Sequence, residues 1–82
     1  MSAVLQLREE MDRLKRRKID LSLTADAAIR AAREILALAA VTPLQEIDLK
    51  TAAAHLTRAV ACQDELGDVI AAIRKVEREL GV

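Results

Sequence analysis

Apolar residues in the first half of the chain, over residues 4–39, recur at alternating intervals of three and four residues. This spacing places them on one stripe of an α-helix and is the a/d pattern of coiled coils; Lys18 is its one polar member. A second stretch over residues 49–80 has the same period, with Gln63 and Glu77 as its polar members. The pattern predicts two long helices.

The boundary between the two periodic stretches lies at Thr42 and Pro43. A threonine followed by proline is a favourable N-cap and first helical residue, so we expect the second helix to begin at Pro43. Gly81 follows the last periodic residue, where a glycine commonly ends a helix. The expected helices span about 3–41 and 43–80, within one helical domain over 1–82.

Two periodic helices of similar length joined by a short break favour an all-α fold, a long antiparallel helical hairpin. Folding the chain at Thr42 brings together residues whose numbers sum to about 84. The chain contains no Phe, Tyr or Trp, so we expect a thin seam in which small residues let the backbones approach closely. We predict that the seam consists of Leu7, Met11, Leu14, Leu21, Ala25, Ala28, Ala32, Ile35, Leu49, Ala52, Leu56, Ala59, Leu66, Ile70 and Ile73.

An alternative reading divides the first helix. The segment 20–24 contains Asp20, Ser22 and Thr24, three residues that favour N-caps. Leu23 within it and Ile19 just before it lie off the heptad stripe. A break near 20–24 would give a three-helix bundle in place of the hairpin.

More apolar residues are present than one seam can bury. The surplus flanks the predicted stripe, and a hairpin needs a cover for it. Dimerisation into a four-helix bundle would supply that cover, and so would a helical protein partner. We assign the oligomer or partner surface to Ile29, Leu36, Val60, Val69 and Val76.

The side chains that could carry chemistry are few. His55 and Cys62 share a helix face but stand about 10.5 Å apart along the axis, too far to bind one zinc ion together. Neither has the base and orienting group that a nucleophile requires, so we expect Cys62 to be a small buried residue. Two isolated glycines cannot form a phosphate-binding loop. We therefore predict no enzyme activity, no metal and no cofactor.

Charge points to no particular class of partner. Thirteen basic and thirteen acidic residues give a net charge of zero, so nothing predicts a global attraction to nucleic acid or a membrane. The run Lys15-Arg16-Arg17-Lys18 spreads around the helix instead of forming one basic face. Lys18 lies on the stripe, and we expect it to reach Asp64, Glu65 or Asp68 and help fix the register.

These observations favour a non-enzymatic helical interaction or adaptor module that acts through oligomerisation and an apolar helix face. The alternative is a small four-helix-bundle regulator that binds nucleic acid, with phosphate contacts from Arg8, Lys15 and Arg33 on one side of the first helix. A single cysteine and the absence of an apolar leader or a long apolar run lead us to expect a cytoplasmic protein with no membrane contact.

Overall fold

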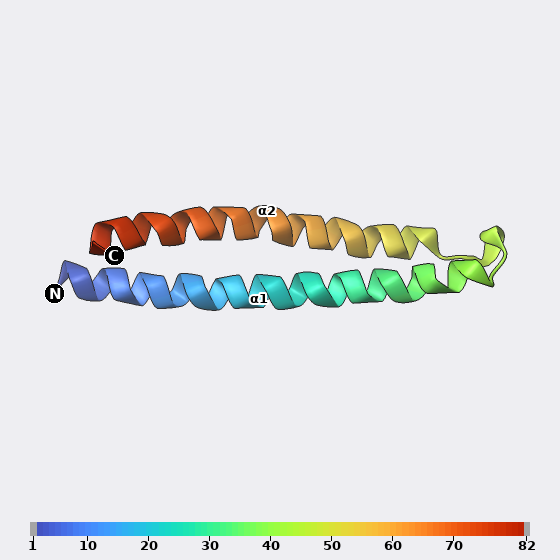
Figure 1. Ribbon diagram of the computed structural model, residues 1–82, viewed down its shortest axis with the longest axis horizontal. Coiled ribbons are helices and arrows are strands. Elements are labelled where there is room, and N and C mark those ends of the chain that lie inside the picture. Colours follow the sequence, from blue (N-terminus) through green and yellow to red (C-terminus); the bar gives the residue numbers. More distant parts are fainter. Residues whose placement is uncertain (1, 82) are drawn as a thin grey trace.

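The computed structural model describes residues 2–81, and the two terminal residues of the expected domain 1–82 lie outside the described residues. Helix α1 spans Ala3–Ala37 and α2 spans Leu49–Leu80, joined by the 3₁₀ turns η1 (Leu38–Ala40) and η2 (Leu44–Glu46). The helices run antiparallel, with both ends of the chain at one end of a rod of 62 × 17 × 14 Å (Figure 1). Over residues 2–81 the fold is all-α and hairpin-like, as the heptad pattern predicts.

Helix α1 is continuous through 20–24, so the three-helix alternative is wrong. The Ser22 hydroxyl donates a hydrogen bond to the Lys18 carbonyl at 3.0 Å, inside the helix instead of at a new helix start. Leu21 is buried between the helices, and its packing holds this segment in the helical path. Burial of one leucine thus outweighs the weak local preference of its polar neighbours for caps.

The connection between the helices is longer than the sequence pattern predicts. After Pro43 the chain makes only the single turn η2, and α2 begins at Leu49 instead of Pro43. Asp48 is the N-cap: its Oδ1 accepts from the Thr51 backbone N–H at 3.1 Å, and its Oδ2 accepts from the Thr51 hydroxyl at 2.6 Å. Thr42 makes no such cap, because Ile47 is extended and interrupts any helix begun at Pro43.

The far end of α2 follows the prediction. Gly81 has a left-handed backbone with φ of 78°, and its N–H bonds to the carbonyls of Arg78 and Glu77. Gly67, in the middle of α2, is exposed and a Cβ there would meet no atom within 4 Å, so it marks neither a close approach nor a break.

The seam between the helices is thin. Its buried side chains are Met11, Leu21, Ala28 and Ala32 from α1 and Ala52, Cys62, Val69 and Val76 from α2. On α1 these residues belong to the predicted stripe. On α2 the buried stripe is rotated by one position, so that it passes through Cys62, Val69 and Val76.

The rotation corrects four assignments. Val69 and Val76, assigned to a partner surface, are only 8% and 4% exposed in the seam, whereas Leu49 and Leu56, assigned to the seam, are exposed. The predicted stripe would also have buried Gln63 and Glu77, and burying polar groups without partners is costly. In the rotated helix Gln63 is exposed and Glu77 is only half-buried, while apolar side chains take the inward positions.

The pairing register of α1 and α2 agrees with a chain reversal near Thr42. Leu21, Cys62 and Val69 form one buried cluster, against which Leu14, Ala25, Leu66 and Ile73 pack. At the edge of this cluster the Arg17 guanidinium pairs with the Glu65 carboxylate across the two helices. Lys18 is exposed, so the ion-pairing role expected of it belongs to its neighbour Arg17.

Candidate interaction surface

The two sides of the seam are different surfaces. On one side the helices border an open groove of about 550 Å³, and we call this side the groove face. The side chains lining it are Ser22, Ala25, Asp26 and Ile29 from α1 and Leu56, Ala59, Val60, Gln63 and Leu66 from α2. On the other side a shallower hollow contains His55, and we call this side the histidine face.

The groove face has small residues at its floor and large aliphatic ones at its walls. Ala25 and Ala59 are half-buried, while Leu56 and Val60 are 43% and 53% exposed. Leu36 lies seven residues after Ile29, and Leu49 seven residues before Leu56, so both extend the same face toward the turn. Both are also exposed, which makes this half of the groove face an almost continuous apolar strip.

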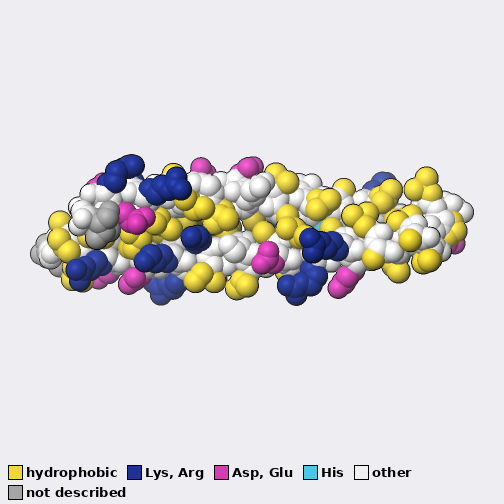
Figure 2. Space-filling model, in the orientation of Figure 1, with side chains coloured by type: hydrophobic (Ala, Val, Ile, Leu, Met, Phe, Trp, Pro, Cys, Tyr) yellow, Lys and Arg dark blue, Asp and Glu magenta, His cyan; other side chains and the backbone are white. Residues whose placement is uncertain are grey.

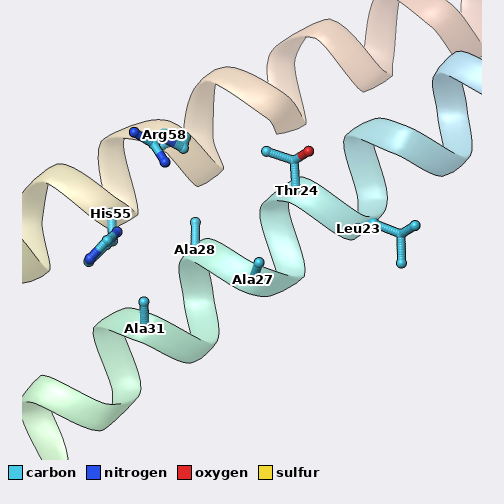
Figure 3. Close-up of a pocket in the computed structure, with 7 residues that line it drawn as sticks. All are labelled: Leu23, Thr24, Ala27, Ala28, Ala31, His55 and Arg58. Carbon is cyan, nitrogen blue, oxygen red and sulfur yellow. The ribbon is translucent and has the colours of Figure 1, made fainter.

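The histidine face is narrower and more polar. The His55 side chain reaches from α2 toward Ala28 and Ala31 of α1, and Arg58 lies along α2 one turn further on (Figure 3). Arg17 and Glu65 belong to this side, since each is seven residues from a residue that lines the hollow, Thr24 or Arg58. Alanines and charged side chains thus line most of this side, and Leu23 is the large aliphatic side chain at the hollow.

The histidine face offers no assembled catalytic or metal-binding group. His55 is half-buried against alanines, and Cys62, one heptad further along α2, is buried in the seam. Among residues 2–81 no three side chains of the His, Cys, Asp or Glu type lie close enough together to hold a metal ion.

A third apolar surface covers the turn. Leu38, Val41 and Leu44 are all more than half exposed, and Val41 is the extreme at 84%. Figure 2 shows hydrophobic side chains between the helices and over the turn end, whereas Lys and Arg side chains are more numerous toward the open end. The heptad pattern missed this surface, because Leu38, Val41 and Leu44 were expected inside the two long helices. In the structure α1 ends before these residues and α2 begins after them.

The predicted site residues are only partly brought together. From the predicted partner surface, Ile29, Leu36 and Val60 do lie on the groove face. Leu56, predicted in the seam, joins them there. The sequence signal that could have identified it is Gln63, one heptad away on the same stripe, whose polar side chain favours an exposed position.

The three residues predicted to contact phosphate are exposed but do not form one basic patch. Arg8 and Lys15 share the stripe of Ser22 and Ile29, which places them on the groove side near the open end. Arg33 lies 25 residues from Arg8, about 37 Å along the helix.

The electrostatics of the connection are dominated by the Asp48 cap. The Thr51 hydroxyl, and next to it the Thr51 backbone N–H, hold the pKa of the Asp48 carboxyl below its ordinary value. Both hydrogen bonds stabilise the charged form, and the helix N-terminus favours a negative charge at the same place.

The chain matches no protein-family model, and no curated protein and no solved structure is significantly similar to it. Within residues 2–81, neither long helix has an apolar stretch sufficient to cross a membrane. The groove face therefore has to be interpreted from its own chemistry.

Proposed function

We propose that this protein is a non-enzymatic helical interaction module that assembles through its groove face with another helical hairpin. The observation that carries the proposal is the apolar strip of Ile29, Leu56 and Val60 beside an alanine floor, left open in a chain of only 82 residues. An alanine floor between aliphatic walls accommodates the ridge of a packed helix.

The energetics favour a cover over this face. Apolar surface removed from water contributes about 25 cal/mol per Å², and the groove face exposes several large aliphatic side chains in a row. Helical hairpins satisfy such a face by pairing into four-helix bundles, in which each helix contacts two neighbours. A long rod with one thin seam would bury additional apolar surface in this arrangement.

The non-catalytic part of the proposal is supported by the surroundings of the two reactive side chains. His55 faces Ala28 and Ala31 instead of a carboxylate that could orient it. Cys62 is buried among aliphatic neighbours, which suits a packing role and also fits a cytoplasmic location, where thiols stay reduced.

The test compares two neighbouring substitutions whose side chains point about 100° apart around α2. Val60→Asp places a carboxylate in the groove, whereas Ala61→Asp places the same group at an exposed position one residue further along. Light scattering after size exclusion should give a parent and an Ala61→Asp mass of at least twice 9.0 kDa. We expect Val60→Asp to run at the monomer mass with its helicity retained.

A parent protein that is monomeric at micromolar concentration contradicts the self-assembly, and so does a Val60→Asp variant that keeps the parent mass. The same run tests the nucleic-acid alternative, because a chain without Trp, Tyr or Phe has almost no absorbance of its own in the nucleic-acid band. Co-eluting absorbance that disappears at high salt would favour that alternative, through Arg8 and Lys15.

A further inference from the structure

We infer that the groove is covered by a second copy of this chain, related by a two-fold axis parallel to the helices. The two turns then lie at the same end, and α1 of each copy packs on α2 of the other. This inference rests on the proposed self-assembly and adds the orientation. A symmetric dimer must bring the same surface of both copies together, which leaves only a few orientations to consider.

The first argument is the order of residue types along the groove face. Positions seven residues apart on α1 lie across the groove from positions seven residues apart on α2, so the face consists of successive layers. Nearest the turn are two apolar layers, followed by a polar one. From the turn they are Leu36 with Leu49, Ile29 with Leu56, and Ser22 with Gln63.

Two further layers complete the face toward the open end. They are a mixed layer of Lys15 with Ile70 and a charged layer of Arg8 with Glu77. The face is therefore graded from apolar at the turn to charged at the open end. Figure 2 shows the same trend in the crowding of Lys and Arg side chains toward that end.

The gradient selects the symmetry axis. A two-fold parallel to the helices places every layer on the same layer of the second copy, so the two apolar layers near the turn meet their copies and the charged layer of Arg8 and Glu77 meets its copy. A two-fold perpendicular to the helices, with full overlap, would place the Leu36 layer on the Arg8 layer. That arrangement would bury Arg8 and Glu77 against leucines that offer no opposite charge from the second copy, which is unfavourable.

The second argument is charge complementarity. In the parallel arrangement Arg8 meets the partner's Glu77, and the partner's Arg8 meets Glu77. Asp12 and Arg74, each on the outer flank of the groove face, meet in the same way. Residues 1–41 carry eight basic and six acidic side chains and residues 42–82 carry five and seven, so the arrangement packs each α1 between two oppositely charged α2 helices.

The third argument is the exposed turn. Leu38, Val41 and Leu44 are the most exposed apolar group at the end of the rod. The parallel arrangement brings the two turns side by side, where these residues can cover one another. A full-length antiparallel dimer would leave both turns in water at opposite ends of the assembly.

The first test uses charge reversal and complementation. Arg8→Glu and Glu77→Arg should each weaken the dimer by about tenfold in sedimentation velocity, because each creates two like-charge contacts. An equimolar mixture of the two variants should regain the parent affinity, since in the mixed dimer each reversed side chain meets its reversed counterpart. Single variants that bind like the parent, or a mixture no better than its components, would overturn the parallel orientation.

The second test measures orientation directly. A nitroxide on Gln45→Cys, at the exposed turn, is placed in a Cys62→Ala background whose helicity and mass are first compared with the parent. We expect a distance between labels of about 20–30 Å, two to three helix diameters. Small-angle scattering should give a dimer no longer than the 62 Å hairpin itself.

The outcomes separate the inference from the proposed function. A label distance near the 62 Å length of the rod indicates a full-length antiparallel dimer. A short label distance in a particle much longer than the hairpin indicates a dimer overlapping only at the turns. Either result overturns the parallel orientation but leaves self-assembly intact, whereas a monomer in both measurements contradicts the proposed function as well.

Discussion

The groove face and the histidine face border the same seam, yet they leave very different surfaces in water. The groove face has Ile29, Leu56 and Val60 around its open groove. The hollow on the histidine face is lined by alanines, Leu23 and Thr24 of α1 and by His55 and Arg58 of α2, and the ion pair between Arg17 and Glu65 crosses the helices beside it. The two sides of the helix pair thus differ in the size and polarity of their side chains, and the hollow on the groove face is the larger.

This difference supports the proposal that the groove face is the surface of assembly. A pair of helices has one stripe on each member to bury, and here the buried stripes are rich in Ala, with single large residues such as Leu21. Large aliphatic side chains from both helices line the groove face, whereas Leu23 of α1 is the large aliphatic side chain at the hollow of the histidine face. A chain selected for stability alone would have no need of that asymmetry, whereas a chain that assembles through one face requires it.

The largest expected effect comes from breaking the seam that both faces share. Leu21 is 5% exposed at the centre of the buried cluster, so Leu21→Ala should lower the free energy of unfolding by about 2–4 kcal/mol. A chain of this size has a total stability of about 4–12 kcal/mol, so the variant would be close to unfolding. Urea titration followed by circular dichroism, at one fixed protein concentration, measures the loss.

Leu23→Ala is the matched control, because Leu23 is 63% exposed two residues away on the same helix. Its effect should stay within about 0.5 kcal/mol of the parent. Equal losses for the two variants would mean that Leu21 does not hold the two faces together and that the seam lies elsewhere.

More of the fold than of the groove face and the histidine face could be predicted from the sequence. The unbroken heptad on α1 predicted one long helix and the position of its buried stripe, and the short break between two periodic stretches predicted the antiparallel pairing. On α2 two stripes of similar apolarity lie side by side, one through Leu49 and Leu56 and the other through Cys62 and Val69. Periodicity alone could not choose between them, because the choice depends on keeping Gln63 and Glu77 hydrated.

The heptad pattern could not predict where the connection ends and α2 begins, and the reason is different. Thr42-Pro43 and Asp48-x-x-Thr51 are both plausible helix starts, and local preference ranks them almost equally. The outcome depends on where the backbone can turn back toward α1, which is a property of the whole hairpin. The same uncertainty concealed the exposed surface of Val41 and Leu44.

An intermediate effect is expected from the ion pair on the histidine face. A double-mutant cycle with Arg17→Ala and Glu65→Ala should give a coupling free energy of about 0.2–1 kcal/mol, reduced because both side chains are about half exposed. The coupling should decline at high salt, and none of the variants should change the mass of the assembly, because the pair lies outside the groove face.

The pair of Arg13 with Glu10, at 3.7 Å within α1, provides the comparison. A cycle there reports only on helix stability and should give a smaller coupling. A loss of assembly on Arg17→Ala would contradict the proposal that the protein assembles through the groove face alone.

The smallest expected effect concerns the cap that sets where α2 begins. Because the Thr51 hydrogen bonds lower the pKa of Asp48, its charged form is favoured in the folded chain. The resulting stability is complete above the ordinary carboxyl pKa of about 3.9 and is lost as pH falls through the lower pKa of the folded state. Asp48→Asn should reduce this acid-side loss while keeping an acceptor for Thr51, whereas Asp48→Ala should lower the melting temperature even at neutral pH.

Melting curves followed by circular dichroism between neutral and acidic pH compare these two variants with the parent. The cap holds the first turn of α2, which is only one turn of the helix that carries Leu49 and Leu56. Asp48→Ala should therefore lower stability without changing the mass of the assembly, since the packing of Val69 and Val76 in the seam holds the rotation of the rest of α2. A change of assembly in Asp48→Ala alone would show that the cap, and not the seam, determines which stripe of α2 forms the groove.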